Sequence, residues 1–269
     1  MAKREKKQMS PLVVFFILLA LAALAVGGWF IYRYFFENRQ GYSPEAFQLD
    51  ENGRMTYTGE DPEVHPRFGI DVSEFRGVID WARVKADGVT FVYVRAGYRG
   101  YGNGKLKEDG MVRQNVTGAR AAGLDVGVYF YSQAVSEAEG TEEAEFVLRT
   151  IEGLDITLPI AIDLEELHEE EARTKNLSWD DRTLIAAAFS ERILREGLTP
   201  MVYGNRTAHE TQLDRAYFPK AHIWYAYYSY PLKKRVSFDI WQYDQHGHVD
   251  GIEPEVDLNL MMTDLRLRK

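Results

Sequence analysis

Four acidic residues stand in or directly after short apolar runs of the sequence, in positions suited to acid catalysis. They are Asp71, Asp163, Glu165 and Asp257. Asp163 and Glu165 are two residues apart, so in an extended strand their side chains face the same way, with Cα atoms about 6.6 Å apart. This brings the two carboxyl groups into the range that glycosidases use. Crowded carboxylates also raise at least one pKa, which leaves a protonated group near neutral pH that can act as an acid.

Each acid also has a structural explanation. A single aspartate after a strand, such as Asp71, most often caps the following helix. The Asp-x-Glu pair at 163–165 could instead bind Mg²⁺ or Ca²⁺, or begin a solvated helix. Three strand ends that converge on one site are harder to explain as caps, so we predict that the four acids are catalytic.

The sequence predicts no metal and no cofactor. The chain has no cysteine, which excludes thiolate zinc sites, iron–sulfur clusters and a cysteine nucleophile. His246 and His248 lie in a glycine-containing loop, where two histidines are more often incidental than metal ligands. The glycine-rich stretch 100–105 fits neither nucleotide-binding fingerprint, and the chain lacks the Gly-x-Ser-x-Gly elbow of serine hydrolases.

Aromatic residues on the predicted strands are candidate sugar-binding side chains. Flat apolar rings stack on sugar rings, while neighbouring carboxylates and amides take the hydroxyl groups. The candidates are Tyr98, Tyr129, Tyr131, Trp224, Tyr228 and Trp241. Aromatic residues in strands more often belong to a hydrophobic core, which is the alternative for each of them.

The acids require a scaffold, and residues 67–269 predict an α/β barrel. Apolar runs predict strands at 68–72, 89–97, 125–132, 158–165, 199–204, 222–228, 238–243 and 255–259. Helical patterns fall between them at 80–86, 111–123, 136–152, 179–197 and 207–213. This alternation predicts a parallel sheet closed into a small, irregular (β/α)8-type barrel, with incomplete helices near its end. In such barrels catalytic groups lie at the carboxyl ends of the strands.

The N-terminal part of the chain predicts a membrane anchor. Residues 11–32 contain no charged side chain and, at about 1.5 Å per residue, would span roughly 33 Å, enough for a bilayer core of about 30 Å. The basic residues of the 1–10 tail indicate a cytoplasmic N-terminus, with everything beyond the span outside. The alternative is a signal peptide cleaved after Ala23-Leu24-Ala25, although the apolar run continues past that point.

Residues 33–66 have scattered Gly and Pro and no sustained apolar period. They predict a spacer or stalk between the membrane and the barrel. Within this segment, a small hairpin is predicted around Asn52-Gly53.

The charge balance argues against a nucleic-acid partner. The net charge is −9, with a pI near 5.3. The first seven residues carry +3, so the remainder carries −12. A protein that neutralises phosphates needs a basic surface instead.

Five blocks of residues 67–269, the predicted barrel, resemble the glycoside hydrolase family 25 lysozymes, the Chalaropsis-type N-acetylmuramidases. The blocks are GIDVS (69–73) followed by Ile79-Asp80-Trp81, FVYVRAGYRG (91–100), GLDVGVYFYS (123–132), AIDLE (161–165) and IWQYDQHGHVDGIEPEVDLN (240–259). Their order and spacing agree over about 67–262. The sequence departs from the family pattern at Glu74-Phe75-Arg76-Gly77, where many members carry a His-Gln-Gly-like turn, and the outer sugar contacts are therefore left open.

The resemblance implies cleavage of the β-1,4 bond between N-acetylmuramic acid and N-acetylglucosamine in peptidoglycan. It also implies that Glu165 is the proton donor, with Asp163 as its partner on the strand and Asp71 and Asp257 as the other acids of the cleft. Tyr131 and Trp241 match positions that contact sugar. Which group attacks the sugar is left open.

Together these features predict a single-pass protein of the bacterial cell membrane whose catalytic domain lies outside the cytoplasm. Its expected partners are peptidoglycan glycan strands and, through the N-terminal helix, the lipid bilayer. One alternative is a catalytically silent cell-wall-binding anchor. Another is a barrel hydrolase that acts on a different glycan, such as chitin.

Overall fold

The computed structural model describes residues 41–62, 64–167, 169–253 and 255–267, together with Leu12 and Gly27. Apart from those two residues, the predicted membrane span at 11–32 lies outside the described part of the chain. No helix within the described residues is long and apolar enough to cross a bilayer. The chain divides into two compact units, one of residues 1–42 with 234–237 and one of residues 43–233 with 238–269. The barrel lies in the second unit.

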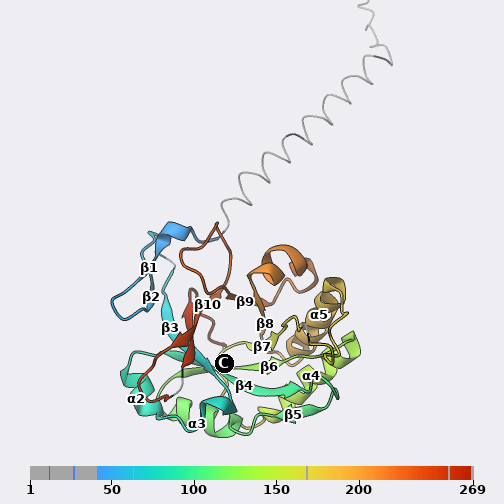
Figure 1. Ribbon diagram of the computed structural model, residues 1–269, viewed down its shortest axis with the longest axis horizontal. Helices are drawn as coiled ribbons and strands as arrows, with labels where there is room; N and C mark the ends of the chain where they lie inside the picture. The colour runs from blue at the N-terminus through green and yellow to red at the C-terminus, as the bar shows by residue number, and fades with distance from the viewer. Residues whose placement is uncertain are drawn as a thin grey trace, which may run out of the picture. The chain divides into compact units, whose positions relative to one another are not determined.

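Eight of the nine strands in the larger sheet close into a barrel (Figure 1). They are β3 (Arg67–Val72), β4 (Phe91–Arg99), β6 (Asp125–Tyr131), β7 (Ile160–Asp163), β8 (Pro200–Asn205), β9 (His222–Ala226), β10 (Ile240–Gly247) and β11 (Val256–Met261). The order is β3-β11-β10-β9-β8-β7-β6-β4, and pairing between β3 and β4 completes the ring. The predicted eight-stranded α/β barrel is therefore confirmed. The remaining strand, β5 (Leu106–Glu108), pairs antiparallel with the last residues of β4, 97–99, beyond the part of β4 that pairs with β3.

One strand departs from the predicted parallel arrangement. β11 runs antiparallel to both neighbours, β10 and β3. Its connection from β10, residues 248–255, is shorter than the dozen or more residues that a parallel crossover requires. The first residues of β11 therefore lie at the same rim as the carboxyl ends of the parallel strands.

The predicted helices form outside the barrel (Figure 1). They are α2 (Trp81–Ala86), α3 (Val112–Ala121), α4 (Glu137–Thr150) and α5 (Trp179–Arg195). Three begin at side-chain caps, because Asp80, Ser136 and Ser178 each accept a hydrogen bond from a backbone N–H of the first turn. Among the described residues after β8, the helical elements are only the short turns η3 (Ala208–Gln212) and η4 (Arg215–Tyr217), so the irregular end of the barrel is confirmed.

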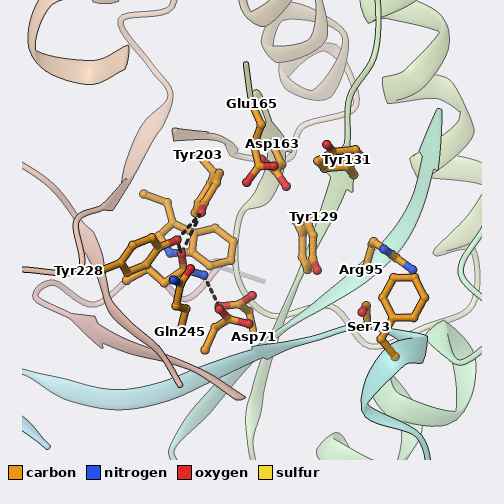
Figure 2. A pocket seen from close by; sticks show the side chains of 14 residues that line it. Asp71, Ser73, Arg95, Tyr129, Tyr131, Asp163, Glu165, Tyr203, Tyr228 and Gln245 are labelled. Atoms are coloured by element: carbon orange, nitrogen blue, oxygen red, sulfur yellow. Dashed lines mark hydrogen bonds between the residues drawn. The ribbon is translucent and has the colours of Figure 1, made fainter. Parts of the chain in front are cut away.

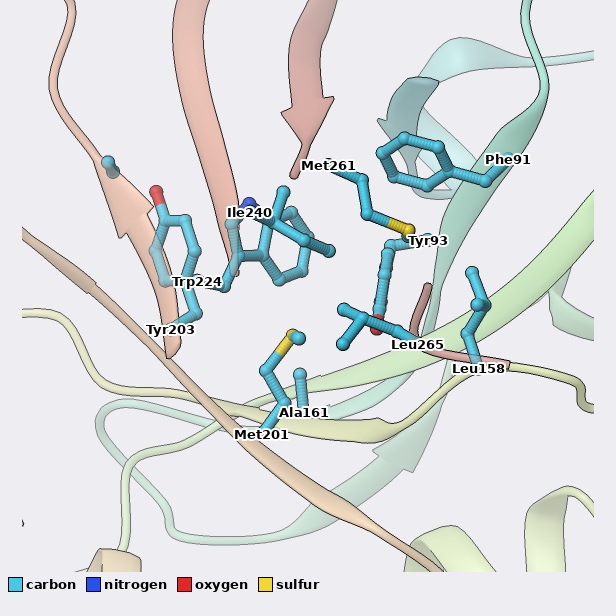
Figure 3. Packing of buried hydrophobic residues seen from close by; sticks show 11 residues of the cluster. Phe91, Tyr93, Leu158, Ala161, Met201, Tyr203, Trp224, Ile240, Met261 and Leu265 are labelled. Carbon is cyan, nitrogen blue, oxygen red and sulfur yellow. The ribbon is translucent and has the colours of Figure 1, made fainter. Parts of the chain in front are cut away.

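The interior of the barrel holds a packed apolar core (Figure 3). It contains Phe91, Tyr93, Leu158, Ala161, Met201, Trp224, Ile240, Met261 and Leu265. The Trp224 ring lies at 4.6 Å from the Tyr93 ring and 5.0 Å from the Tyr203 ring, between centroids. Such packing fixes the base of the cleft.

The hairpin predicted around Asn52-Gly53 is confirmed as β1 (Phe47–Leu49) and β2 (Met55–Tyr57). Its position corrects the prediction of a spacer over 33–66. Phe47 is only 1% exposed, and its ring centroid lies 5.1 Å from that of Trp241. Residues from Ser43 onward thus belong to the same compact unit as the barrel, because the hairpin buries its apolar face on β10.

Replacing Phe47 by leucine tests this docking. Phe47→Leu removes the edge-on ring contact with Trp241 while keeping an apolar side chain, so we expect a loss of about 1 kcal/mol in unfolding free energy. For a domain of this size that lowers the melting temperature by roughly 2–4 °C. Leu49→Ala, at an exposed position of the same strand, should change it by less than about 1 °C. Equal effects at both positions would mean that the hairpin is not docked.

Candidate active site

A cavity of about 270 Å³ opens at the carboxyl ends of the parallel strands (Figure 2). Its lining is Asp71, Ser73, Phe75, Arg95, Tyr129, Tyr131, Asp163, Glu165, Tyr203, Trp224, Tyr228, Gln242, Gln245 and Asp257. All four predicted acids are in this set. The barrel therefore brings together carboxyl groups from three separate parts of the chain.

The four acids reach the cavity by different routes. Asp71 on β3 pairs directly with Asp257 on β11, and Asp257 reaches this rim only because β11 is antiparallel. Asp163 is the last residue of β7. Glu165 lies beyond the end of that strand, not on it as the sequence predicted, yet its side chain still lines the cavity.

Asp71 lies at the centre of a hydrogen-bond network. Its Oδ1 accepts from Gln242 Nε2 at 2.8 Å and from Asn259 Nδ2 at 2.7 Å. Burial, followed by the neighbouring charge of Asp257, raises the pKa of Asp71 well above its usual range, although the two amide donors oppose the shift. Asp71 is thus held in one orientation, and its carboxyl group is harder to ionise than that of an ordinary aspartate.

The same network extends to aromatic side chains at the far side of the cavity. The hydroxyl groups of Tyr203 and Tyr228 donate to Gln242 Oε1 at 2.8 and 2.7 Å. Trp224 Nε1 donates to Asn259 Oδ1 at 2.8 Å. Because both amide oxygens are occupied, each amide nitrogen is directed at Asp71.

Asp163 is buried with fewer partners. Within the described part of the chain, its Oδ1 has no hydrogen-bond donor. Burial raises the pKa of Asp163 well above its usual range, and the negative charges of Glu165 and Asp71 raise it further. An acid in such surroundings is costly to ionise, which indicates a role other than holding the fold together.

Glu165 lies nearer the opening and is partly buried. Burial raises the pKa of Glu165, and the charge of Asp257 adds to the effect, whereas a hydrogen bond from the Tyr131 hydroxyl lowers it. A carboxyl group with a raised pKa that also borders the cavity can hold a proton and deliver it to a bound substrate.

Asp257 differs from the other acids because it has a cationic partner. Arg76 Nη2 lies 2.9 Å from Asp257 Oδ2. Burial raises the pKa of Asp257, while the bond and charge of Arg76 lower it. Arg76 stands in η2 (Glu74–Arg76), the turn where the sequence departs from the family pattern.

The same turn contributes an aromatic ring to the mouth of the cavity. Phe75 is 77% exposed, and its ring centroid lies 4.9 Å from the guanidinium carbon of Arg95. Two hydrogen bonds hold the Arg95 side chain in place. Its Nε donates to Asp109 at 2.8 Å, and its Nη2 donates to Glu74 at 3.1 Å. The turn thus offers a flat apolar face beside the carboxyl groups.

Four of the six predicted sugar-binding aromatic residues line the cavity: Tyr129, Tyr131, Trp224 and Tyr228. Trp241 does not. It is fully buried on the outer face of β10, donates from Nε1 to the Tyr227 carbonyl and packs on Phe47, because side chains alternate along a strand. Tyr98 lies beside the cavity in a separate pocket.

Six further residues line the cavity that were not predicted from the sequence: Tyr203, Gln242, Arg95, Ser73, Phe75 and Gln245. For Tyr203 the deciding observation is the strand register, which only the structure shows. Tyr203 pairs directly with Asp163 across β7 and β8, so both side chains lie on the same face. For Gln242 the signal was a single amide among the apolar and aromatic residues of 238–243.

No group of three or more His, Asp or Glu side chains in the described residues is arranged to hold a metal ion. The prediction of hydrolysis without a cofactor stays a prediction. The cavity's own groups include buried carboxyl groups with raised pKa values and aromatic surfaces. These are the groups that hydrolysis of a glycosidic bond requires.

Comparison with known proteins agrees with this chemistry. A model of the glycosyl hydrolases family 25 matches residues 70–252. An autolytic lysozyme from Clostridium acetobutylicum is 29% identical over 192 residues, which cover 71% of this chain and 54% of that protein. The crystal structure of a lysozyme from Streptomyces coelicolor matches with a TM-score of 0.59 and 26% identity, over 72% of this chain and 90% of that chain.

A third match concerns the fold alone. The modular autolysin LytC from Streptococcus pneumoniae, solved with a synthetic peptidoglycan ligand, has a TM-score of 0.66 at 23% identity, over 80% of this chain and 52% of that chain. This chain thus spans about half the length of the Clostridium and Streptococcus proteins.

Proposed function

The chain belongs to the glycosyl hydrolases family 25, and on that premise we propose that it is a muramidase that cleaves peptidoglycan between N-acetylmuramic acid and N-acetylglucosamine. The observation that supports this proposal most directly is the gathering of Asp71, Asp163, Glu165 and Asp257 in one cavity with aromatic walls. The lysozymes among the relatives support the same substrate.

In the proposed reaction Glu165 is the general acid. Its proton passes to the glycosidic oxygen as the bond from that oxygen to the anomeric carbon breaks, and the leaving sugar departs as an alcohol. Positive charge develops at the anomeric carbon, where ionised carboxylates among Asp163, Asp71 and Asp257 stabilise it. A water molecule supplies the new hydroxyl group, either directly or after attack by a carboxylate or by the acetamido group of the substrate. The configuration of the first product separates direct attack from the other two routes.

Digestion of purified peptidoglycan by the full chain, with mass spectrometry of the fragments, tests the proposal. New reducing ends on muramic acid are expected. New reducing ends on N-acetylglucosamine, or turnover of chitin in preference to peptidoglycan, would overturn it. Binding to the wall without turnover would identify a silent anchor instead.

The pairing of Arg76 with Asp257 predicts a change in pH dependence. Arg76 lowers the pKa of Asp257, so without it Asp257 ionises only at higher pH. We expect Arg76→Gln to move the acidic limb of the kcat/KM profile to higher pH, with a loss of about threefold on that limb. Arg76→Lys should largely restore the profile. Arg83→Gln, which breaks an exposed pair with Asp250 outside the cavity, should leave it unchanged.

We also propose that residues 11–32 anchor the protein in the membrane, with the barrel outside the cytoplasm. The support is the uncharged run of residues 11–32 and the basic tail before it. In cells stripped of wall, an added protease should degrade the barrel domain, and the intact protein should remain in the membrane fraction. A soluble form that begins near Val26 would indicate a cleaved signal peptide and contradict the anchor.

A further inference from the structure

A row of paired residues leads from the catalytic cavity toward the edge of the sheet. Asp163 pairs with Tyr131 between β7 and β6, and Tyr131 pairs with Tyr98 between β6 and β4. Tyr98 pairs in turn with Lys107 on β5, the strand added outside the barrel. Directly paired residues place their side chains on the same face, and neighbouring strands are about 4.8 Å apart. Lys107 therefore lies roughly 10 Å beyond Tyr131 along the same surface.

This outer part of the row borders a second pocket, of about 410 Å³. Its lining includes Tyr98, Tyr101, Asn103, Lys107 and Glu171, with Gly100 and Gly102 between them. Tyr101 is 49% exposed, and Tyr98 is partly exposed. The pocket therefore combines two aromatic rings with a cation, an anion and an amide.

Arg95 connects the two pockets. It lines the catalytic cavity on the same side as Tyr131 (Figure 2), and its guanidinium carbon lies 5.1 Å from the Tyr98 ring centroid. The Nζ atom of Lys107 also lies over the Tyr98 ring, 5.7 Å from its centroid. A substrate in the cavity can thus extend past Arg95 onto Tyr98 without leaving the surface.

The charges of the second pocket are free for a ligand. Within the described residues, neither Lys107 nor Glu171 forms an ion pair, and both side chains are exposed. Glu108, the acid next to Lys107 on β5, is paired with another residue: its Oε1 lies 3.9 Å from Arg113 Nε. An ammonium group and a carboxylate on one pocket suit a ligand that carries both a carboxylate and an amino group.

We propose that this second pocket binds the peptide arm that the muramic acid of peptidoglycan carries. Lys107 receives a carboxylate of the peptide, Glu171 receives an amino group, and the Tyr98 and Tyr101 rings cover its apolar parts. The inference rests on the proposed muramidase function and adds to it a preference for glycan that bears peptides. None of the four cavity acids lines this subsite, so we expect it to affect substrate binding and not the chemical step.

The test compares uncrosslinked glycan strands that carry peptides with the same strands after an amidase has removed the peptides. For Lys107→Gln we expect KM to rise about threefold on peptide-bearing strands, with kcat unchanged and no effect on peptide-free strands. Glu171→Gln should act in the same direction, and Lys107→Arg should retain the original KM. Lys105→Gln, a nearby exposed lysine outside the pocket, is the matched control.

Equal effects on both substrates, or none on either, would overturn the subsite while leaving muramidase activity in place. If the unmodified protein cleaves neither substrate, the proposed function fails, and co-sedimentation with the two kinds of strand decides the subsite alone. Weaker retention of Lys107→Gln on peptide-bearing strands only would still support it, and equal retention would reject it.

Discussion

Glu165→Gln is expected to reduce turnover of peptidoglycan about 10²–10⁴-fold, the usual cost of removing a general acid. Glutamine keeps the shape of the side chain and can still accept the hydrogen bond from Tyr131, but it has no proton to give to the leaving sugar. Sugar hydroxyl groups are poor leaving groups without protonation. Binding to the wall and the melting temperature should therefore stay close to those of the unmodified protein.

The matched control is the next residue. Glu166 is exposed and does not line the cavity, so Glu166→Gln should change turnover by less than about twofold. If Glu165→Gln kept full activity while Glu166→Gln lost it, Glu165 would not be the carboxyl group that protonates the substrate. The assignment of all four acids would then fail.

The pH profile gives a second check on Glu165. A general acid works only while protonated, so activity should fall as the pH rises through the pKa of Glu165. Burial and Asp257 raise that pKa, which moves this alkaline limb to higher pH than an ordinary glutamate would give. In Glu165→Gln the residual activity should lack this limb.

The sequence predicted the barrel, and the position of the four acids at one end of it, because both follow from local patterns. Alternating apolar runs and helix caps such as Ser178 define elements without knowledge of their neighbours. Once the strands close into a ring, their carboxyl ends must meet, so Asp71 and Asp163 arrive at the same rim. Asp257 reached that rim for a different reason, the reversal of β11, which the short 248–255 connection already implied.

The aromatic residues were harder to predict because their role depends on which face of a strand they occupy. Along β10, Ile240 and Gln242 face the interior, so Trp241 must face outward against the hairpin. The sequence contained this alternation, but an aromatic residue is compatible with either face. Gln242 was the more informative residue, since an amide in an apolar strand requires polar partners, and it finds them in Asp71 and two tyrosines.

Asp163→Asn is expected to have two opposite effects, a strong loss of activity and a gain in stability. Removing this carboxylate takes away charge that stabilises the developing cation, and we expect a loss of at least about 10²-fold in kcat. The same change removes a buried acid that has no donor on Oδ1 among the described residues and whose pKa is raised by the charges of three other carboxyl groups, those of Glu165, Asp71 and Asp257.

The gain in stability should depend on pH in a definite direction. The pKa of Asp163 is raised in the folded protein, so in the pH range between the unfolded pKa of about 4 and the folded pKa the folded state keeps a proton that the unfolded chain has released, and above the folded pKa the buried group is ionised at a cost. The unmodified protein therefore loses stability as the pH rises from the unfolded pKa through the folded one, whereas Asp163→Asn does not. We expect the two melting temperatures to coincide at about pH 3, with the variant higher by roughly 2–4 °C at neutral pH.

Thermal unfolding followed across this pH range distinguishes the charge effect from a general change in packing. Glu166→Gln, at an exposed position, should show the same melting temperature as the unmodified protein throughout. If the difference in melting temperature between Asp163→Asn and the unmodified protein did not change with pH, a change in packing, and not the ionisation of Asp163, would explain the gain in stability. An unfolding temperature below that of the unmodified protein at neutral pH would show that the Asp163 carboxylate stabilises the fold, and the crowded acids would then be structural.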